Sequence, residues 1–398
     1  MKKFLLSNFL LLVLFSACEL TQSEQPAGHF TRIYNQSDFS GSFYPIDIIQ
    51  AADSGFVILG KTIDPDFTFP VTYLLRTDAR GNFMWDNAFS PYVNPLPGGL
   101  WREGNDYFTI AMDDISLETY VIKVNENNKV AEQIATLPYQ YPLSLAKLES
   151  GYLLQYYNRN ARNTGMAKLD VAFSEEWSQE YPVLEDAEEP IITHLRSPQP
   201  TLPFFSGQIT GTSTYFINGF YNFTLSLIFQ NTSTPESFGV INGFRDKGAI
   251  SSAQSLPNGA FALSRYNFDN NFLLPNQTVE PAGIVSADDL AGFEFPELVP
   301  GAHVVTKLVE VNGENYIIYA SSTKSNQIVL LAYDEAGLLV GSRYIGNNYP
   351  YEVGNFTLTG DDGLAITGTT YVAGRFPRIS LFKLSATDVR ELIAWTGE

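Results

Sequence analysis

Residues 56–60, FVILG, and residues 71–89, VTYLLRTDARGNFMWDNAF, decide the fold of this chain. Both open with apolar runs that are typical of short strands covered on both faces. A tight turn at Asp78–Gly81 follows the second run and leads into another strand, which carries Trp85. In such a turn Asp accepts hydrogen bonds from the next amides and Gly supplies positive φ. The stretch therefore predicts consecutive antiparallel strands joined by short turns.

The same pattern recurs about every fifty residues along the chain. An apolar residue anchors the predicted second strand of each repeat, in the order Phe56, Tyr107, Tyr152, Tyr215, Ala260, Tyr316 and Leu364. The predicted third strands lie in residues 73–82, 120–129, 165–173, 226–234, 282–292, 329–337 and 380–388. Small sheets stacked in a ring bury both of their faces and leave only short edges. We therefore predict an all-β fold, a β-propeller of seven four-stranded blades.

Two recurring details support this interpretation. Asp is followed three positions later by Gly at Asp78/Gly81, Asp289/Gly292 and Asp334/Gly337, which predicts a hairpin turn after each third strand. Trp85 and Trp177 stand seven positions after Asp78 and Asp170. A large aromatic residue at this phase of an outer strand is expected to pack between neighbouring sheets.

The two ends of the chain compete for one position in the predicted ring. Residues 28–39, GHFTRIYNQSDF, match the phase of the outer strand at 81–89 and precede the first repeat. They are expected to complete the last blade, although residues 388–395, DVRELIAW, could fill the same outer position. Residues 182–210 form a long acidic, Pro-rich insertion next to the most degenerate repeat.

The Gly-led apolar strand followed by LLRTDARGNFMW resembles the repeats of secreted and surface β-propeller lipoproteins of Gram-negative bacteria. Those repeats read roughly Gly-Gly-aromatic, then Lys-x-Asp-x-x-Gly-x-x-x-Trp. The resemblance covers most of residues 44–395 and implies the fold and export of the chain. Members of this group share no reaction, so the resemblance implies no catalytic residue.

The N-terminus predicts export and lipid attachment. Lys2 and Lys3 precede an apolar run over residues 9–15, which is too short to span a bilayer permanently. The following LFSAC resembles a bacterial lipoprotein signal and places Cys18, the one cysteine of the chain, at the acylated position. We expect a signal peptide over residues 1–17, a lipidated tether over 18–28 and a single propeller domain over 29–398, anchored to the bacterial outer membrane on its periplasmic or surface side.

Charge limits the partners of the predicted domain. The net charge of −19 disfavours nucleic acid and anionic lipid surfaces, and it favours a neutral or cationic ligand. The alternative interpretation of this charge is solubility alone.

Metal and cofactor motifs are weak in this sequence. His29, His194 and His303 lie far apart in different repeats and show no ligand spacing. Acidic pairs such as Asp64/Asp66, Asp113/Asp114 and Asp361/Asp362 lack calcium-loop spacing and are expected to be solvated loop charges. We therefore predict no metal site and no cofactor.

An aromatic–Pro step suggests where a ligand could bind. Such steps occur at Tyr44, Tyr141, Tyr181 and Tyr349, and each is expected just before an innermost strand. Pro can simply begin a strand there while Tyr covers the joint between blades. Alternatively, the tyrosines ring one mouth of the channel, where their apolar faces and polar tips suit sugars and peptides.

The sequence thus favours a lipid-anchored, noncatalytic binding or assembly module of the bacterial envelope, with a glycan, peptide or protein ligand. A hydrolase or lyase acting on glycans is the alternative from a different functional class. A purely structural subunit of an outer-membrane complex is a third possibility.

Overall fold

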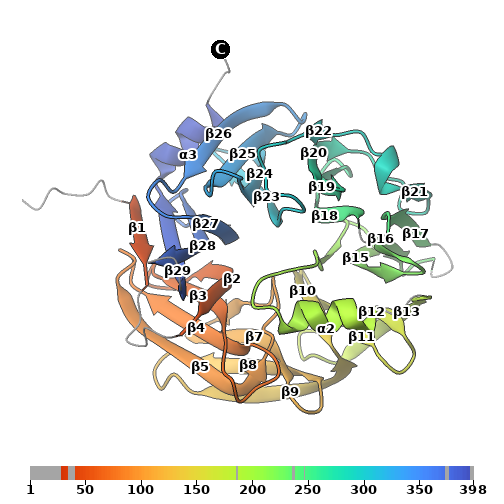
Figure 1. Cartoon of the computed structure of the whole chain (residues 1–398), viewed down its shortest axis with the longest axis horizontal. Coiled ribbons are helices and arrows are strands. Elements are labelled where there is room, and N and C mark those ends of the chain that lie inside the picture. Colours follow the sequence, from red (N-terminus) through yellow and green to blue (C-terminus); the bar gives the residue numbers. More distant parts are fainter. Residues whose placement is uncertain are drawn as a thin grey trace, which may run out of the picture.

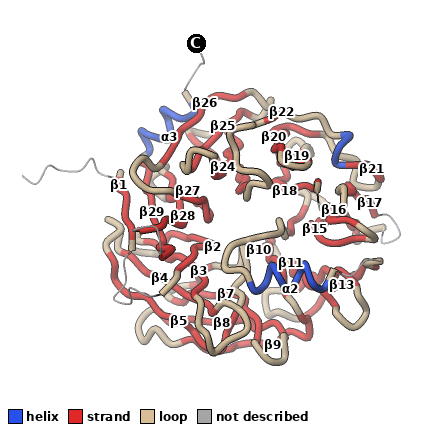
Figure 2. Tube along the Cα trace, in the orientation of Figure 1, coloured by secondary structure: helices blue, strands red, loops and turns tan. Residues whose placement is uncertain are grey.

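The computed structural model describes residues 28–34, 41–184, 187–234, 238–245, 247–372 and 376–394. Small antiparallel sheets stand around a central axis (Figure 1), and strands dominate the trace (Figure 2). The predicted signal peptide, Cys18 and most of the tether lie outside the described residues.

Pairing groups the described strands into six sheets, and the predicted all-β propeller is confirmed. One of these sheets has eight strands because the outer strand of one blade also pairs with the next blade, and dividing it there gives seven blades. From the axis outward, blade 1 contains β2 (Phe43–Gln50), β3 (Phe56–Thr62), β4 (Val71–Thr77) and β5 (Phe83–Val93). Blade 2 contains β6 (Trp101–Glu103), β7 (Asp106–Asp113), β8 (Glu118–Asn125) and β9 (Ala131–Gln140). Blade 3 contains β10 (Pro142–Leu148), β11 (Gly151–Asn158), β12 (Asn163–Leu169) and β13 (Glu175–Pro182). Blade 4 contains β14 (Ser206–Gln208), β15 (Thr214–Tyr221), β16 (Thr224–Asn231) and β17 (Phe238–Asn242), and β21 (Ile284–Ser286) pairs in parallel with β17. Blade 5 contains β18 (Gly248–Ser255), β19 (Phe261–Asn267), β20 (Asn270–Gln277) and β22 (Phe293–Glu294). Blade 6 contains β23 (Val304–Val311), β24 (Glu314–Ser322), β25 (Ile328–Asp334) and β26 (Leu339–Ile345). Blade 7 contains β27 (Tyr351–Leu358), β28 (Leu364–Val372), β29 (Phe376–Leu384) and, outermost, β1 (Phe30–Ile33). The described helices are α2 (Glu188–Arg196), the 3₁₀ turn η1 (Ala287–Asp289) and α3 (Ala386–Ile393).

Contacts between neighbouring blades form the core. Every residue of β3 and β4 is buried, as expected for strands covered on both faces. Trp85 packs between blades 1 and 2 in one cluster with Leu59 and Tyr107. Trp177 stacks on Tyr215 of blade 4, with ring centroids 6.0 Å apart. The predicted packing of both tryptophans is confirmed, and full burial of each large apolar side chain stabilises the fold by roughly 1.5–3 kcal/mol.

The predicted turn chemistry holds in two of the three Asp/Gly pairs. Asp78 Oδ1 accepts hydrogen bonds from the amides of Arg80 and Asn82, each at 2.8 Å, and Gly81 has a φ of 72°. The turn at Asp334 is built in the same way, with Gly337 at a φ of 84°.

The prediction for the fifth repeat is wrong. Its third strand is β20 (Asn270–Gln277), whereas residues 282–292 contain β21 and η1. Asp289 forms a capping box with Ser286 instead of a hairpin turn. β21 pairs in parallel with β17, so this segment extends the edge of the preceding blade.

The N-terminal strand closes the ring, as predicted. β1 pairs with β29 over the register from Phe30↔Lys383 to Ile33↔Ser380. The Phe30 ring packs edge-on against Phe56 of blade 1 at 6.3 Å. β1 is therefore the outermost strand of the last blade and also contacts the first blade.

The competing prediction for the C-terminal segment is wrong, because residues 386–393 form helix α3. Ser385 caps α3 in a capping box with Asp388. Asp388 also pairs with His29 at 2.9 Å and with Arg343 at 2.6 Å. These hydrogen bonds and the Arg343 charge hold the pKa of Asp388 below its usual range, although burial acts in the opposite direction. Across the described parts of the chain, no helix has the length and hydrophobicity needed to cross a membrane.

Candidate functional site: the central cavity

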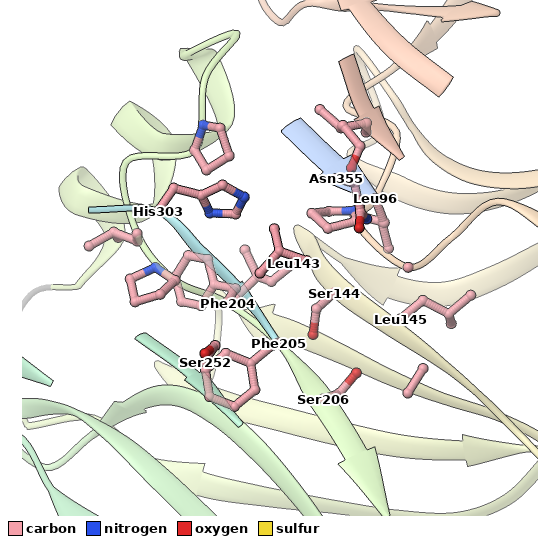
Figure 3. Close-up of a pocket in the computed structure, with 18 of the residues that line it drawn as sticks. Leu96, Leu143, Ser144, Leu145, Phe204, Phe205, Ser206, Ser252, His303 and Asn355 are labelled. Carbon is pink, nitrogen blue, oxygen red and sulfur yellow. Dashed lines mark hydrogen bonds between the residues drawn. The ribbon is translucent and has the colours of Figure 1, made fainter. Parts of the chain in front are cut away.

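A cavity of about 530 Å³ lies at the centre of the ring (Figure 3). Its walls come from the innermost strands β2, β10, β14, β18, β23 and β27, from the turn at residues 94–98 and from the segment at 194–206. Leu143, Phe204 and Phe205 form much of the apolar wall, and Ser144 and Ser252 add hydroxyl groups (Figure 3). Apolar walls with a few polar groups are typical of small-molecule sites.

The insertion after blade 3 crosses one mouth of this cavity. Helix α2 lies over the inner part of blade 3 (Figure 1), with Ile191 and Leu195 buried in a cluster that contains Tyr141. Farther along, the Gln199 side chain hydrogen-bonds Glu352 and approaches the Tyr371 hydroxyl of blade 7 at 3.4 Å. Since these contacts lie on opposite sides of the axis, the segment spans the mouth.

Buried amide contacts fix the end of the insertion. Asn218 on β15 donates from its backbone to the Phe205 carbonyl at 2.9 Å. Its Nδ2 donates to the Pro203 carbonyl at 2.7 Å and to the Ile250 carbonyl at 2.9 Å. Gln155 Nε2 donates to the Asn218 carbonyl at 2.7 Å, so a rigid polar network positions the Phe204–Phe205 wall.

Three lysines line the cavity at different depths. Lys61 lies on β3 near the insertion, Lys307 lies in the middle of β23 and Lys147 is exposed near the end of β10. Lys61 is 6% exposed, and burial lowers its pKa to about 8. It makes no hydrogen bond or ion pair with any residue that the structure describes.

Lys307 is held differently. Its Nζ donates to the Phe356 carbonyl, and the nearby charge of Asp47 opposes the lowering of its pKa by burial. Asp47 lies behind the cavity wall, where Asn355 Nδ2 donates to it at 3.0 Å. Burial raises the pKa of Asp47 even though Lys307 acts in the opposite direction.

Two histidines that are far apart in the sequence share this cavity. The Nδ1 atom of His194 accepts hydrogen bonds from the backbone amides of Leu202 at 3.0 Å and Thr201 at 3.2 Å. Burial lowers the pKa of His194 to about 3, and the charges of Lys61 and His303 act in the same direction. The neutral ring therefore carries its proton on Nε2. His303 Nε2 donates to the Gly354 carbonyl at 3.2 Å.

The four tyrosines of the aromatic–Pro steps do not form one ring. Tyr44 is half-buried on β2 and is opposite Lys61 in the register. Tyr141 is buried with the cluster around α2. Tyr181 is wrongly predicted to precede an innermost strand. It is the penultimate residue of the outermost strand β13, where it is buried and its hydroxyl donates to Gln230 Oε1 at 2.9 Å. Tyr349 is 46% exposed and lines a separate groove beside β26 and β1.

The acidic pairs of the sequence bind backbone amides and a lysine of the fold. Asp113 accepts from the amide of Ser116 at 2.6 Å, and Asp114 accepts from that of Thr68 at 2.9 Å. Asp361 pairs with Lys383 at 2.9 Å. Within the described ranges, no cluster of three or more His, Cys, Asp or Glu side chains could hold a metal ion.

Sequence reasoning missed Lys61, His194 and His303 as members of one site. A lysine inside a second strand, FVILGKT, whose residues are all buried, was the available signal, because a buried charge is normally paired. The histidines gave no signal, since only the closed ring and the insertion bring α2 next to β23.

Comparison with known proteins gives similarity in structure alone. No family model and no curated protein matches the sequence. Similar solved structures include BamB from Moraxella catarrhalis (11% identity, TM-score 0.39, covering 86% of this chain and 98% of that chain) and the BP39L lectin from Burkholderia pseudomallei (11%, 0.49, 90% and 96%). An oligogalacturonate lyase in complex with manganese is similar at 11% identity and a TM-score of 0.45, over 88% of this chain and 99% of that chain. At these values the function has to be argued from the cavity itself.

Proposed function

We propose that this chain is a noncatalytic binding protein of the bacterial envelope and that a small ligand occupies the central cavity. The support is the cavity of about 530 Å³, which the insertion spans at one mouth and in which apolar walls are mixed with hydroxyl and amine groups. A ligand enclosed in this way loses most of its contact with water, as is typical of small-molecule sites.

The described cavity gives less support to a glycoside hydrolase. Such an enzyme needs two carboxyl groups at either side of the scissile bond, and no Asp or Glu occurs among the described residues that line the cavity.

A role of Tyr44 or Tyr349 in glycan or peptide binding remains a prediction, because their exposed surface lies outside the cavity.

Filling the cavity tests this function. We expect Val305→Trp to abolish binding, because Val305 is half-buried in the cavity wall and an indole would occupy the ligand volume. Binding of a library of phenyl and naphthyl alcohols, acids and amines is to be measured by ligand-observed NMR. Val171→Trp, at a position that is 74% exposed, is the matched control. Compounds that bind wild type and both variants equally would contradict a site in the cavity.

We also propose that Cys18 is acylated and anchors the domain, residues 29–398, through a tether at 18–28. The support is the position of this single cysteine directly after an apolar leader. In cells fed a labelled fatty acid, wild type is expected to carry the label in the membrane fraction and Cys18→Ala is expected to lose it. Label retained by Cys18→Ala, or wild type released without label, would contradict the anchor.

A further inference from the structure

We propose that the ligand of the central cavity is a small organic carboxylate with an apolar body and that Lys61 binds its charge. This inference rests on the proposed function and specifies the class of ligand. It depends on the unequal distribution of charge over the molecule, on the lack of an acceptor for Lys61 among the described residues and on the other donors that line the cavity.

The cavity and the whole chain have opposite charge. The chain has a net charge of −19. Among the described residues that line the cavity, three are lysines and two are histidines, whereas none is Asp or Glu. Salt screens the exterior charge within about 8 Å at physiological ionic strength, but Lys61 is buried and Lys307 is half-buried, where electrostatic interactions are stronger. The local field therefore favours an anion, contrary to the expectation from net charge.

Lys61 differs from the other buried cations of the described chain. Arg76 pairs with Asp53 at 2.7 Å, and Lys383 pairs with Asp361 at 2.9 Å. Arg265 donates to the Leu290 carbonyl at 3.0 Å, and Arg378 donates to the Pro377 carbonyl at 3.0 Å. Lys61 is equally buried but has no such acceptor among the described residues. Buried charges are normally paired, so a bound anion would supply the missing partner.

Neighbouring donors suit a carboxylate. His194 lines the same cavity as Lys61, and the lysine charge contributes to lowering the pKa of His194. Because Nδ1 of this neutral ring accepts from backbone amides, Nε2–H remains as a donor on a ring that lines the cavity. An ammonium and an N–H group match the two oxygens of one carboxylate.

The other residues that line the cavity indicate the chemistry of the rest of the ligand. Leu143, Phe204 and Phe205 present an apolar surface (Figure 3) in the cavity that these donors also line. The described lining contains no arginine, the side chain that commonly recognises phosphate with two hydrogen bonds. The cavity thus fits a monoanion with an apolar body better than a compact dianion such as phosphate.

Three probes of the same shape separate charge from fit: 2-naphthoate, neutral 2-naphthamide and cationic 2-naphthylmethylammonium. Binding to wild type, Lys61→Met and the control Lys123→Met is to be measured by calorimetry at pH 7. Lys123 is on β8 and pairs with Glu132 at 3.4 Å, outside the cavity. Lys61→Met is expected to melt no lower than wild type, because Met retains the apolar stem without the buried charge.

We expect wild type to bind 2-naphthoate more tightly than either other probe. Lys61→Met should weaken the binding of 2-naphthoate about ten- to hundredfold while changing that of 2-naphthamide less than about twofold, and Lys123→Met should change neither. Equal binding of 2-naphthoate and 2-naphthamide to wild type, or 2-naphthoate binding that survives in folded Lys61→Met, would overturn the carboxylate inference and leave a cavity-binding function standing. Failure of all three probes to bind would overturn both.

Discussion

Deleting residues 19–34 is expected to lower the free energy of unfolding by about 5 kcal/mol, because the deletion removes two buried aromatic side chains and a complete outer strand. Phe30 and Tyr34 are 6% and 5% exposed, and the Tyr34 hydroxyl donates to the Gly81 carbonyl at 2.9 Å. The edge of β29 would lose its partner over four residue pairs, and an unpaired edge promotes aggregation. Thermal unfolding and light scattering measure both effects.

A shorter deletion of residues 19–27 serves as the control, because it leaves β1 in place. It is expected to unfold at the temperature of the full-length chain and to remain monodisperse. Phe30→Ala should fall between the two deletions. Equal melting temperatures for both deletions would show that β1 does not hold the ring closed.

The second large effect is a fall of 2-naphthoate affinity at high pH. The carboxylate binds the protonated form of Lys61, whose pKa in the free protein is about 8, and a bound anion would raise that pKa further. Affinity should therefore be constant below about pH 7 and fall close to tenfold per pH unit above pH 8. The pKa of Lys61 is lowered by burial. Tyr44 and His194 do not change charge between pH 7 and 9, because the pKa of Tyr44 is raised above its ordinary value and that of His194 is about 3.

Calorimetry from pH 6.5 to 9.5 tests this dependence, with Lys61→Met as the control. Its residual binding should vary much less with pH, because Lys307, whose pKa burial also lowers, is then the buried cavity lysine that can still titrate. The pKa of Lys61 also bears on stability. The pKa of Lys61 is lower in the folded protein than the ordinary value of about 10.4. At pH 7 the buried protonated lysine therefore lowers the free energy of unfolding by on the order of 3 kcal/mol. This destabilisation decreases as the pH rises from 8 toward 10. A pH-independent affinity for 2-naphthoate would exclude Lys61 as the group that binds its charge.

Most of the fold could be predicted because the second and third strands of each blade are buried on both faces. Short continuous apolar runs such as FVILG are hard to place in any other architecture once they repeat. The fifth repeat was mispredicted for a local reason. β20 has a short apolar core, Phe272–Leu274, flanked by Asn and followed by Pro275, and Pro normally marks a strand end. Here a register shift between Phe261 and Leu263 of the paired strand accommodates it.

The cavity could not be predicted, because Lys61, His194 and Lys307 come from β3, α2 and β23, which the sequence separates by more than a hundred residues at each step. Ring closure and the crossing insertion create this proximity, and neither leaves a motif. Net charge predicts a neutral or cationic ligand, whereas the lining of the cavity leads to the proposed carboxylate. The two differ because net charge describes the exterior, and a cavity with few charged side chains can have the opposite sign.

A crystal structure of the protein soaked with 6-bromo-2-naphthoate tests the central claim most directly, because the anomalous signal of bromine locates the probe without ambiguity. The bromine is predicted to lie in the central cavity against Phe204 and Phe205, with the carboxylate within hydrogen-bond distance of Lys61 Nζ. A probe bound only on the outside of the ring, or one in the cavity with its carboxylate turned away from Lys61, would contradict the account.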